Sequence, residues 1–556
     1  MIALTSTLSA AQKAGGQTLY KVTFTKTGET TRVYGSDTTN RIPTGFPLKH
    51  YRDDWLQTAE LTVENRDGNL TALDLIGYQA LIEYGYQTSA GDEYQGSDVL
   101  KCISQGFVSG YGEQLVIFGL AGRGNQMAED RASSAYEPDS ANKDTVKTIV
   151  TAIVTATMPP FNHCEVLTLT WELTAYQEDE LANVFKPADF LRVHKDQSRL
   201  EVLKDVLSNT GLDGRFEGDG ALHIFQTFAR PWTAATGIDL NEIAKPSVPS
   251  DWAANTAYSV NDRRKPTTQN GYYYVCSTAG TSGGTEPSWA RKDGDTVSDD
   301  GVIWTCRDTN YVYTCTTTGT TGGTEPVWTY AKNDTMSDSG VVWTLQYDYD
   351  YDDVASGHNF WRKGVTRRLV IPNKITVRSV PGAKTIYSGN ATDARSNALL
   401  PIEEVTYRTL VSNAEAADIA LAKIDRAARD AETGSGFSML NIGQEIHDYI
   451  LITDSWEGDA CRGRIRSLTR YAGPGVFKMT FSFGIRLAKS EMGSLRSLRL
   501  AEIEPVPPWA WEMLDYIDAV VELHKKDISD LYSIIKQMQI GVPDWHVSRN
   551  LRIPVI

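Results

Sequence analysis

The sequence has 556 residues, of which 41% are hydrophobic and 22% charged, an ordinary globular composition in a chain large enough to bury several cores. At about 150 residues per domain, roughly three to four domains are expected. With 70 acidic against 54 basic residues the net charge is -16, which disfavours a protein that grips nucleic acid through its phosphates. The acidic surplus fits simple solubility or, as the alternative, the wall of a channel along which DNA slides without sticking.

The opening segment, MIALTSTLSAAQKAGGQ, has no charged n-region and only a short apolar stretch, so we expect no secretion signal. No run approaches the roughly 18 apolar residues that a membrane-spanning helix needs. The six cysteines are scattered through a long chain, which argues against a disulfide scaffold and for synthesis in a reducing cytoplasm.

Residues 1–128 are expected to form a first β domain. TAELTVENRDGNLTALDLIGYQALIEYGY contains short strands punctuated by Asp67-Gly68 and Gly77, and LKCISQGFVSGYGEQLVIFGLAGRG adds two strands around Gly110-Tyr111-Gly112. A barrel or sandwich is the natural way to close this many short strands.

Residues 129–250 are expected to form a small α+β domain. Ser198 and Glu201 have the spacing of a capping box that opens the helix RLEVLKDVLSNTG. RFEGDGALHIFQ follows as a hairpin. A shorter helix is expected within 145–158, although threonine and valine are poor helix formers.

Residues 251–355 are expected to be an inserted, aromatic-rich β module with an internal repeat. GTSGGTEPSW at Gly280 returns as GTTGGTEPVW at Gly319, and SDDGVIWTC at Ser298 returns as SDSGVVWTL at Ser337, 39 residues later in both cases. We expect the second unit to lack the lead-in WAANTAYSVNDRRK. We also expect the flanking stretches, IDLNEIAKP and RKGVTRRLVIPNKITVRSV, to continue one β domain across the insertion.

The lead-in WAANTAYSVNDRRKPTTQNGYYYVC resembles small carbohydrate-binding modules of the chitin-binding type. Such modules bind sugars by stacking exposed aromatic rings on them, and the candidate residues here are Trp289, Trp328 and Tyr273. A unit this small has little else to bury, so we assign Trp304 and Trp343, in apolar strands, to the core. For Trp289 and Trp328, after a glycine-rich loop, core and ligand contact both remain open.

Two further features of this segment concern cysteine and metal chemistry. A Cys276–Cys306 bond is left open, because Cys315 matches Cys276 whereas Leu345 replaces Cys306. The stretch QYDYDYDDVAS alternates tyrosine and aspartate but lacks the glycine and glutamate of a calcium loop. We expect a solvated acidic edge strand there, and we assign no metal site and no cofactor.

Residues 356–492 are expected to form a second β domain with a helix at 413–432. Asn413 is an acceptable N-cap, the residues after it are good helix formers, and Gly434 and Gly436 are expected to stop the helix. In VFKMTFSFG, large apolar and polar residues alternate, which is typical of a half-buried antiparallel strand. Gly473-Pro474-Gly475 is the expected turn before it.

The stretches VENRDGNLTALDLIGYQALIEYGY and IGQEIHDYILITDSWEGDACRGRIRSLTRYAGPGVFKMTFSFG resemble tail-hub (baseplate-hub) proteins of tailed bacteriophages. The resemblance implies an α+β, mainly β, multidomain homotrimer with two hub-type β-barrel domains per subunit in a ring beneath the tail tube. The implied location is the virion tail tip, assembled in the host cytoplasm. The implied partners are tail-tube, distal-tail, tape-measure and fibre or tip proteins. From the inserted units we add host-surface glycans as a partner, and from the net charge we expect no stable nucleic-acid binding.

Residues 493–556 are expected to form a proline-rich hinge, a coiled-coil helix and a C-terminal tail. An unbroken heptad seam carries the oligomerisation candidates Leu514, Ile517, Val521, His524, Ile528, Leu531, Ile535 and Met538. The number of strands is not fixed by these residues, and three is what the hub resemblance implies. His524 either sets the register, binds a partner or is tolerated.

No H-E-x-x-H, P-loop, G-x-S-x-G or C-x-x-C motif is present. We therefore expect no catalytic residues and a non-enzymatic structural protein that connects the tail tube to tip components and aids host attachment and DNA passage. The alternatives are a polysaccharide-degrading tail protein and a purely polysaccharide-binding adhesin.

Overall fold

The computed structural model of the chain describes residues 2–36, 42–110, 113–137, 144–174, 177–183, 191–227, 229–309, 311–331, 334–345, 347–353, 358–381, 383–456 and 459–483. The hinge, the heptad seam and the C-terminal tail expected at 493–556 lie outside these residues, so they remain predictions. Within the described part, no helix is long and apolar enough to cross a membrane.

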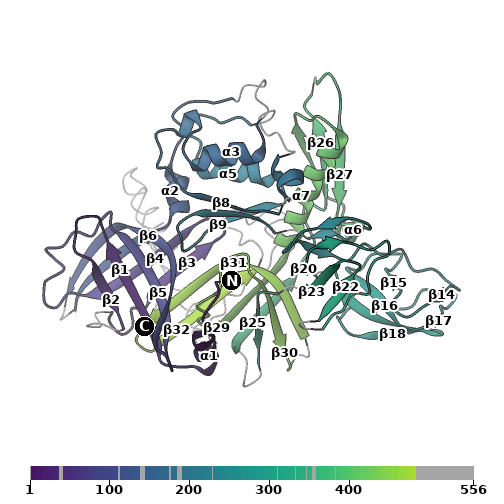
Figure 1. The fold of residues 1–556 in the computed structure, drawn as a ribbon, viewed down its shortest axis with the longest axis horizontal. Helices are drawn as coiled ribbons and strands as arrows, with labels where there is room; N and C mark the ends of the chain where they lie inside the picture. Colours follow the sequence, from purple (N-terminus) through teal and green to yellow (C-terminus); the bar gives the residue numbers. More distant parts are fainter. Residues whose placement is uncertain are drawn as a thin grey trace, which may run out of the picture. The chain divides into compact units, whose positions relative to one another are not determined.

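One sheet of 13 strands contains strands from both ends of the described chain (Figure 1). Its N-terminal strands are β1 (Thr18–Thr25), β2 (Arg32–Gly35), β3 (Leu48–Asp53), β4 (Gln57–Glu64), β5 (Gln79–Thr88), β6 (Gly91–Gly110) and β7 (Glu113–Ala121). Its later strands are β24 (Tyr349–Asp352), β25 (Phe360–Arg367), β29 (Glu432–Met439), β30 (Tyr449–Asp454), β31 (Asp459–Gly473) and β32 (Val476–Phe483).

The strand order of this sheet corrects the expected pair of barrels. The order is β2-β1-β5-β6-β7-β4-β3-β31-β32-β29-β25, with β30 paired to β31 and β24 to β30. A barrel requires its first and last strands to pair. Here β3 pairs instead with β31, from Leu48 opposite Ala472 to Asp53 opposite Ser467. The described strands therefore form an open sheet in which the two β regions are continuous, with no closed barrel.

The two β regions also share one hydrophobic core. Val22, Phe24 and Phe118 from the first region belong to the same buried cluster as Ile452 and Met479 from the second. In β32 the predicted alternation is confirmed up to Phe481, because Phe477, Met479 and Phe481 are buried and the residues between them are less so. At the end of the strand Ser482, predicted on the polar face, is buried as well as Phe483. The predicted acidic edge strand is β24, which pairs only with β30, but its Tyr349 and Tyr351 are buried in this core.

The helix expected at 413–432 is confirmed as α7 (Asn413–Ala431). It packs on a three-stranded sheet, β27-β26-β28, formed by β26 (Lys374–Ser379), β27 (Ser388–Thr392) and β28 (Glu403–Arg408). The short helix α6 (Ala394–Leu399) connects β27 to β28. The expected role of Gly434 and Gly436 as helix stops is wrong, because both lie within β29. A Cβ atom on Gly436 would come 2.1 Å from the Phe481 ring, so this residue is glycine because a phenylalanine of β32 lies across the strand.

The α+β region consists of α3 (Val146–Val154) and α5 (Arg199–Ser208) over the sheet β8-β10-β9 (Figure 1). Its strands are β8 (Leu169–Glu172), β9 (Leu212–Phe216) and β10 (Leu222–Gln226). The capping box of Ser198 and Glu201 is present. This region shares a second core with α7. The remaining short elements outside the aromatic module are α1 (Ser6–Ala14), α2 (Arg123–Glu129), η1 (Pro159–Phe161) and η2 (Glu178–Asn183).

Candidate functional site: two nested aromatic units

The aromatic segment folds as two units, one inserted into the other. The inner unit contains β14 (Ala257–Tyr258), β15 (Arg263–Arg264), β16 (Tyr272–Thr278), β17 (Gly280–Thr281), β18 (Thr296–Asp299) and β19 (Val302–Asp308). The outer unit contains β11 (Arg230–Pro231), β12 (Gly237–Ile238) and β13 (Ile243–Lys245), then β20 (Tyr313–Thr317), β21 (Gly319–Thr320), β22 (Thr335–Asp338) and β23 (Val341–Leu345). The outer unit is therefore assembled from chain on both sides of the inner one.

The expectation that the repeat at 319–345 lacks a lead-in is wrong. Its lead-in is WTAATGIDLNEIAKP, which precedes the inner unit in the chain. This lead-in takes the same place in the outer unit as WAANTAYSVNDRRKP takes in the inner one. The indole of Trp232 donates to Asp338 at 2.7 Å, as the indole of Trp252 donates to Asp299 at 2.8 Å. Strand β13 pairs with β20, so IDLNEIAKP completes the outer unit and does not continue into the strands after the insertion.

Each unit has its own aromatic core. Trp304 and Trp343 are fully buried, which confirms their assignment to the interior. Trp304 donates its indole N–H to Asp299 at 3.0 Å, and Trp343 donates to Asp338 at 3.2 Å. One buried carboxylate therefore satisfies two indoles in each unit, as buried polar groups require.

The three sugar-binding candidates have different environments. Tyr273 is 5% exposed and Trp328 is 4% exposed, so neither ring presents a face that a sugar could stack on. Trp289 is half-buried and packs on Tyr274, with ring centroids 4.2 Å apart. A stacking role among the three is therefore open to Trp289 alone.

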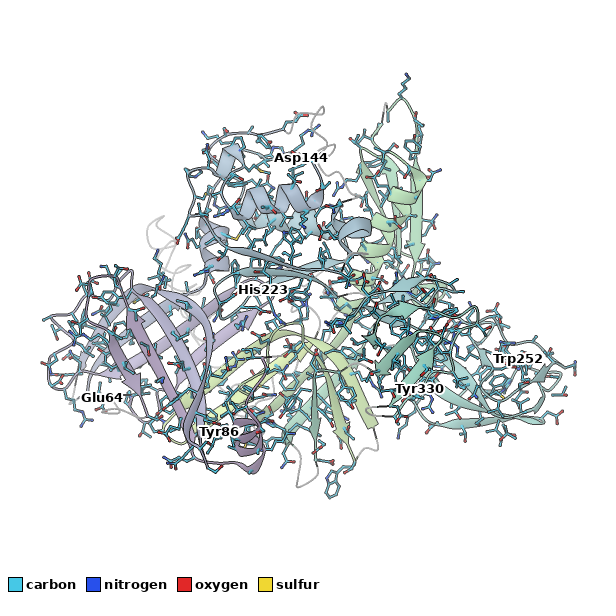
Figure 2. All side chains as sticks on the ribbon, in the orientation of Figure 1. Glu64, Tyr86, Asp144, His223, Trp252 and Tyr330 are labelled. Atoms are coloured by element: carbon cyan, nitrogen blue, oxygen red, sulfur yellow. The ribbon has the colours of Figure 1, made fainter. Side chains whose placement is uncertain are left out.

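Trp328 is buried at the junction between the units. Next to it, Arg263 of β15 forms an ion pair with Glu325 of the outer unit. Each terminal guanidinium nitrogen lies 3.0 Å from one carboxylate oxygen. The Tyr273 hydroxyl donates to that of Tyr330 at 3.3 Å. A cavity of about 310 Å³ lies at this junction. Figure 2 labels Trp252 in the inner unit and Tyr330 in the outer one.

The cysteines are all free, so the bond left open between Cys276 and Cys306 is not formed. Both lie in the core of the inner unit. Burial raises the pKa of the Cys306 thiol to about 12, and it also raises the pKa of Cys276. Protonated, enclosed thiols act as small apolar core residues.

A charged junction ties the α+β region to α7. Asp213 of β9 lies 3.0 Å from Arg426 and also contacts Arg429, both on α7. Burial works to raise the pKa of Asp213, but these two guanidinium groups hold it well below the usual value. A second buried carboxylate, Glu445, contacts Arg52 of β3 at 3.4 Å and Arg215 of β9 at 3.3 Å. These ion pairs connect three parts of the fold.

Among the described residues, Glu172, Glu217 and His223 have the spacing of metal ligands, with ligand atoms within 4.8 Å of one another. Nδ1 of His223 lies 2.7 Å from Glu172, and Nε2 lies 3.0 Å from Asp219. Burial works to lower the pKa of His223, but the hydrogen bonds to these carboxylates raise it overall. Both ring nitrogens of His223, which Figure 2 labels, already have carboxylate partners, so the geometry is that of a charged histidine bridging acidic groups.

No protein-family model and no curated protein matches the chain. Among solved structures it is similar to a tail protein from Neisseria meningitidis MC58, with 9% identity, a TM-score of 0.43, and coverage of 84% of this chain and 96% of that one. It is similar to prophage tail protein gp18 from Listeria monocytogenes EGD-e, with 9% identity, a TM-score of 0.40, and coverage of 86% and 98%. It is also similar to the 43 kDa tail protein of prophage MuSo2 from Shewanella oneidensis, with 10% identity, a TM-score of 0.38, and coverage of 84% and 97%.

Proposed function

We propose that this chain is a structural, non-enzymatic component of a bacteriophage tail tip, of the tail-hub kind, that connects the tail tube to tip and fibre components. The observation that carries the proposal is the pairing of β3 with β31. It joins the two regions whose sequences resemble hub proteins into a single sheet with a single core.

A continuous sheet suits a part that transmits mechanical load. Force on one β region passes to the other through backbone hydrogen bonds and shared apolar packing, with no flexible linker in that path. The ion pairs of Asp213 and Glu445 fix the α+β region to the same body. Removing one partner of a buried pair of this kind costs about 3–5 kcal/mol, so the parts should resist reorientation.

In the assembled tail, three copies would surround the axis and contact tail-tube, distal-tail, tape-measure and fibre or tip proteins. The acidic surface would line the path of DNA, and assembly would take place in the host cytoplasm. The heptad seam from Leu514 to Met538 would hold the trimer together.

Light scattering of the purified chain tests this assembly. The expected mass is three times the 61.4 kDa of one chain. A stable monomer at micromolar concentration would overturn the hub proposal. Truncation before Pro505 should weaken trimerisation, and unchanged assembly of the truncated chain would remove the role of the seam.

A glycan-binding role remains a second candidate, carried by the half-buried ring of Trp289. It predicts binding of soluble chito-oligosaccharides that is lost in Trp289→Ala and retained in Trp456→Ala, which removes a highly exposed tryptophan outside the units. Release of reducing sugar from bacterial polysaccharide would instead favour the polysaccharide-degrading alternative.

A further inference from the structure

The two nested units carry the same surface feature in two different states. It consists of the glutamate and tryptophan of the repeated motif, Glu286 with Trp289 in the inner unit and Glu325 with Trp328 in the outer one. We name it the Glu–Trp face. In each copy the glutamate accepts the indole N–H of its own tryptophan, at 2.8 Å and 2.6 Å respectively.

In both copies a backbone N–H group from the end of the lead-in also donates a hydrogen bond to the glutamate carboxylate. Glu286 accepts the backbone N–H of Thr267 at 2.9 Å, and Glu325 accepts that of Ser247 at 2.8 Å. Thr267 and Ser247 occupy the same place after the lysine–proline end of each lead-in. The two faces are thus equivalent, with the carboxylate oriented before any partner arrives.

In the outer unit the Glu–Trp face is covered by a protein strand edge. Arg263, from β15 of the inner unit, places both terminal guanidinium nitrogens 3.0 Å from the two oxygens of Glu325. Beside it, the guanidinium of Arg307 lies 4.4 Å from the centre of the Tyr330 ring. The chain therefore shows what this face binds: an arginine-bearing edge with aromatic contacts alongside.

In the inner unit the equivalent face has no such cover. Among the described residues, Glu286 accepts hydrogen bonds from Thr267 and Trp289 and contacts no lysine or arginine. Trp289 is half-buried where Trp328 is 4% exposed. Glu286 and Trp289 therefore have the same arrangement as Glu325 and Trp328, but without a counterpart of the Arg263 guanidinium.

We propose that the Glu–Trp face of the inner unit is a docking surface for a protein partner that presents an arginine from a strand edge to Glu286. Arginine and carboxylate form paired, charge-assisted hydrogen bonds, and a flanking tryptophan supplies the aromatic surface on which such contacts concentrate. The proposal is independent of the tail assignment, since it rests only on the equivalence of the two units.

The partner differs from β15 in one respect. The exposed Arg291 follows Trp289 at the position that Tyr330 has in the outer unit. In the outer unit, Tyr273 of β16 contacts Tyr330. At the equivalent position of the inner unit, an acidic residue next to the partner's arginine would form an ion pair with Arg291. The partner edge should therefore carry an arginine and, next to it, a carboxylate.

A suitable probe is a head-to-tail cyclised hairpin peptide of residues 261–275 with Tyr273→Glu, carrying a fluorophore, titrated with the full chain. We expect saturable binding that falls by about tenfold or more in Glu286→Gln, since the loss of one charged partner typically has this effect. Glu60→Gln, an exposed glutamate on β4, is the charge-matched control and should bind like the wild type. A peptide with Arg263→Ala as well should not bind.

Three results would overturn the proposal. They are the absence of saturable binding at millimolar peptide, equal binding by wild type and Glu286→Gln, and equal binding of the peptide lacking Arg263. If the absence of peptide binding is accompanied by chito-oligosaccharide binding that depends on Trp289, the surface is assigned to glycans.

Discussion

The inner and outer units have almost the same motif, GTSGGTEPSW and GTTGGTEPVW, yet their tryptophans are in different environments. Trp328 is 4% exposed and lines the junction cavity together with Arg263 and Arg264 of the inner unit, whereas Trp289 is half-buried. Exposure of an aromatic side chain in a repeat is thus set by the neighbour that packs on the repeat, and the motif itself does not decide it.

The units also differ in how the chain completes them. The inner unit is continuous from its lead-in to β19, whereas the outer unit closes only after the chain returns from the inner one. Opening of the inner unit should therefore weaken the outer one, whereas the inner unit can stay folded when the outer one opens. This asymmetry can be tested.

Loss of the buried carboxylate that bridges the indoles should have the largest effect. Asp338→Ala leaves the indoles of Trp232 and Trp343 and the backbone N–H of Gly322 without their acceptor, at a cost of about 4 kcal/mol. Asp299→Ala removes the same contacts from the inner unit. Hydrogen exchange should show opening of the outer unit alone in Asp338→Ala and of both units in Asp299→Ala, because the two segments of the outer unit are joined only through the inner one. The same pattern in both variants would contradict the asymmetry.

Breaking the junction should have an intermediate effect. Arg263→Ala removes the ion pair with Glu325, which is shielded from solvent, and should destabilise the module by about 2 kcal/mol. It should also expose Trp328, which acrylamide quenching would detect as increased quenching. Glu286→Gln, at the uncovered equivalent face, should change stability by less than about 0.5 kcal/mol. Equal destabilisation by the two variants would show that the inner face is also covered.

A smaller difference concerns pH. Burial raises the pKa of Glu242 in the outer lead-in, with Arg230 partly opposing the shift. Because its folded-state pKa lies above the unfolded value, the stability it contributes is present at low pH and is lost as pH rises through the folded pKa. Glu242→Gln should flatten this decline, measured as the melting temperature of the module across mildly acidic pH. A decline that stays as steep in the variant would exclude Glu242 as its source.

The smallest effect is expected when a core residue of one unit is replaced by the residue found at the equivalent position of the other unit. Cys306 lies opposite Tyr274 in the inner unit, and Leu345 lies opposite the equivalent tyrosine, Tyr313, in the outer unit. The two positions are therefore equivalent. Cys306→Leu should therefore change stability by less than about 1.5 kcal/mol, as measured by denaturant unfolding. A larger loss would mean that the two cores are packed differently at this point.

Local signals in the sequence were sufficient for the local elements. The capping box at Ser198, the helix from Asn413 and the alternation of β32 follow from spacing within a few residues, and each is found in the structure. The repeat offset correctly identified two units, and the apolar strands correctly placed Trp304 and Trp343 in the core.

The failures involve residues far apart in the chain. Trp232 was missed as part of a lead-in because its unit resumes only after the inner one, although the match of WTAATGIDLNEIAKP to WAANTAYSVNDRRKP was available. The pairing of β3 with β31 leaves no local trace, so closure into barrels was expected. Trp328 lies at a junction with Arg263 of another unit, which no pattern around Trp328 reveals.

The pairing of β3 with β31 has a consequence for synthesis on the ribosome. β3 ends at Asp53 and its partner begins at Asp459, so about 400 residues must be translated before this strand can be covered. At roughly 5–20 residues per second, that interval lasts about 20–80 s. Throughout it, the nascent chain carries an open strand edge of the kind that recruits other chains into aggregates. Expression at lower temperature or with added chaperones should therefore improve the yield of full-length protein.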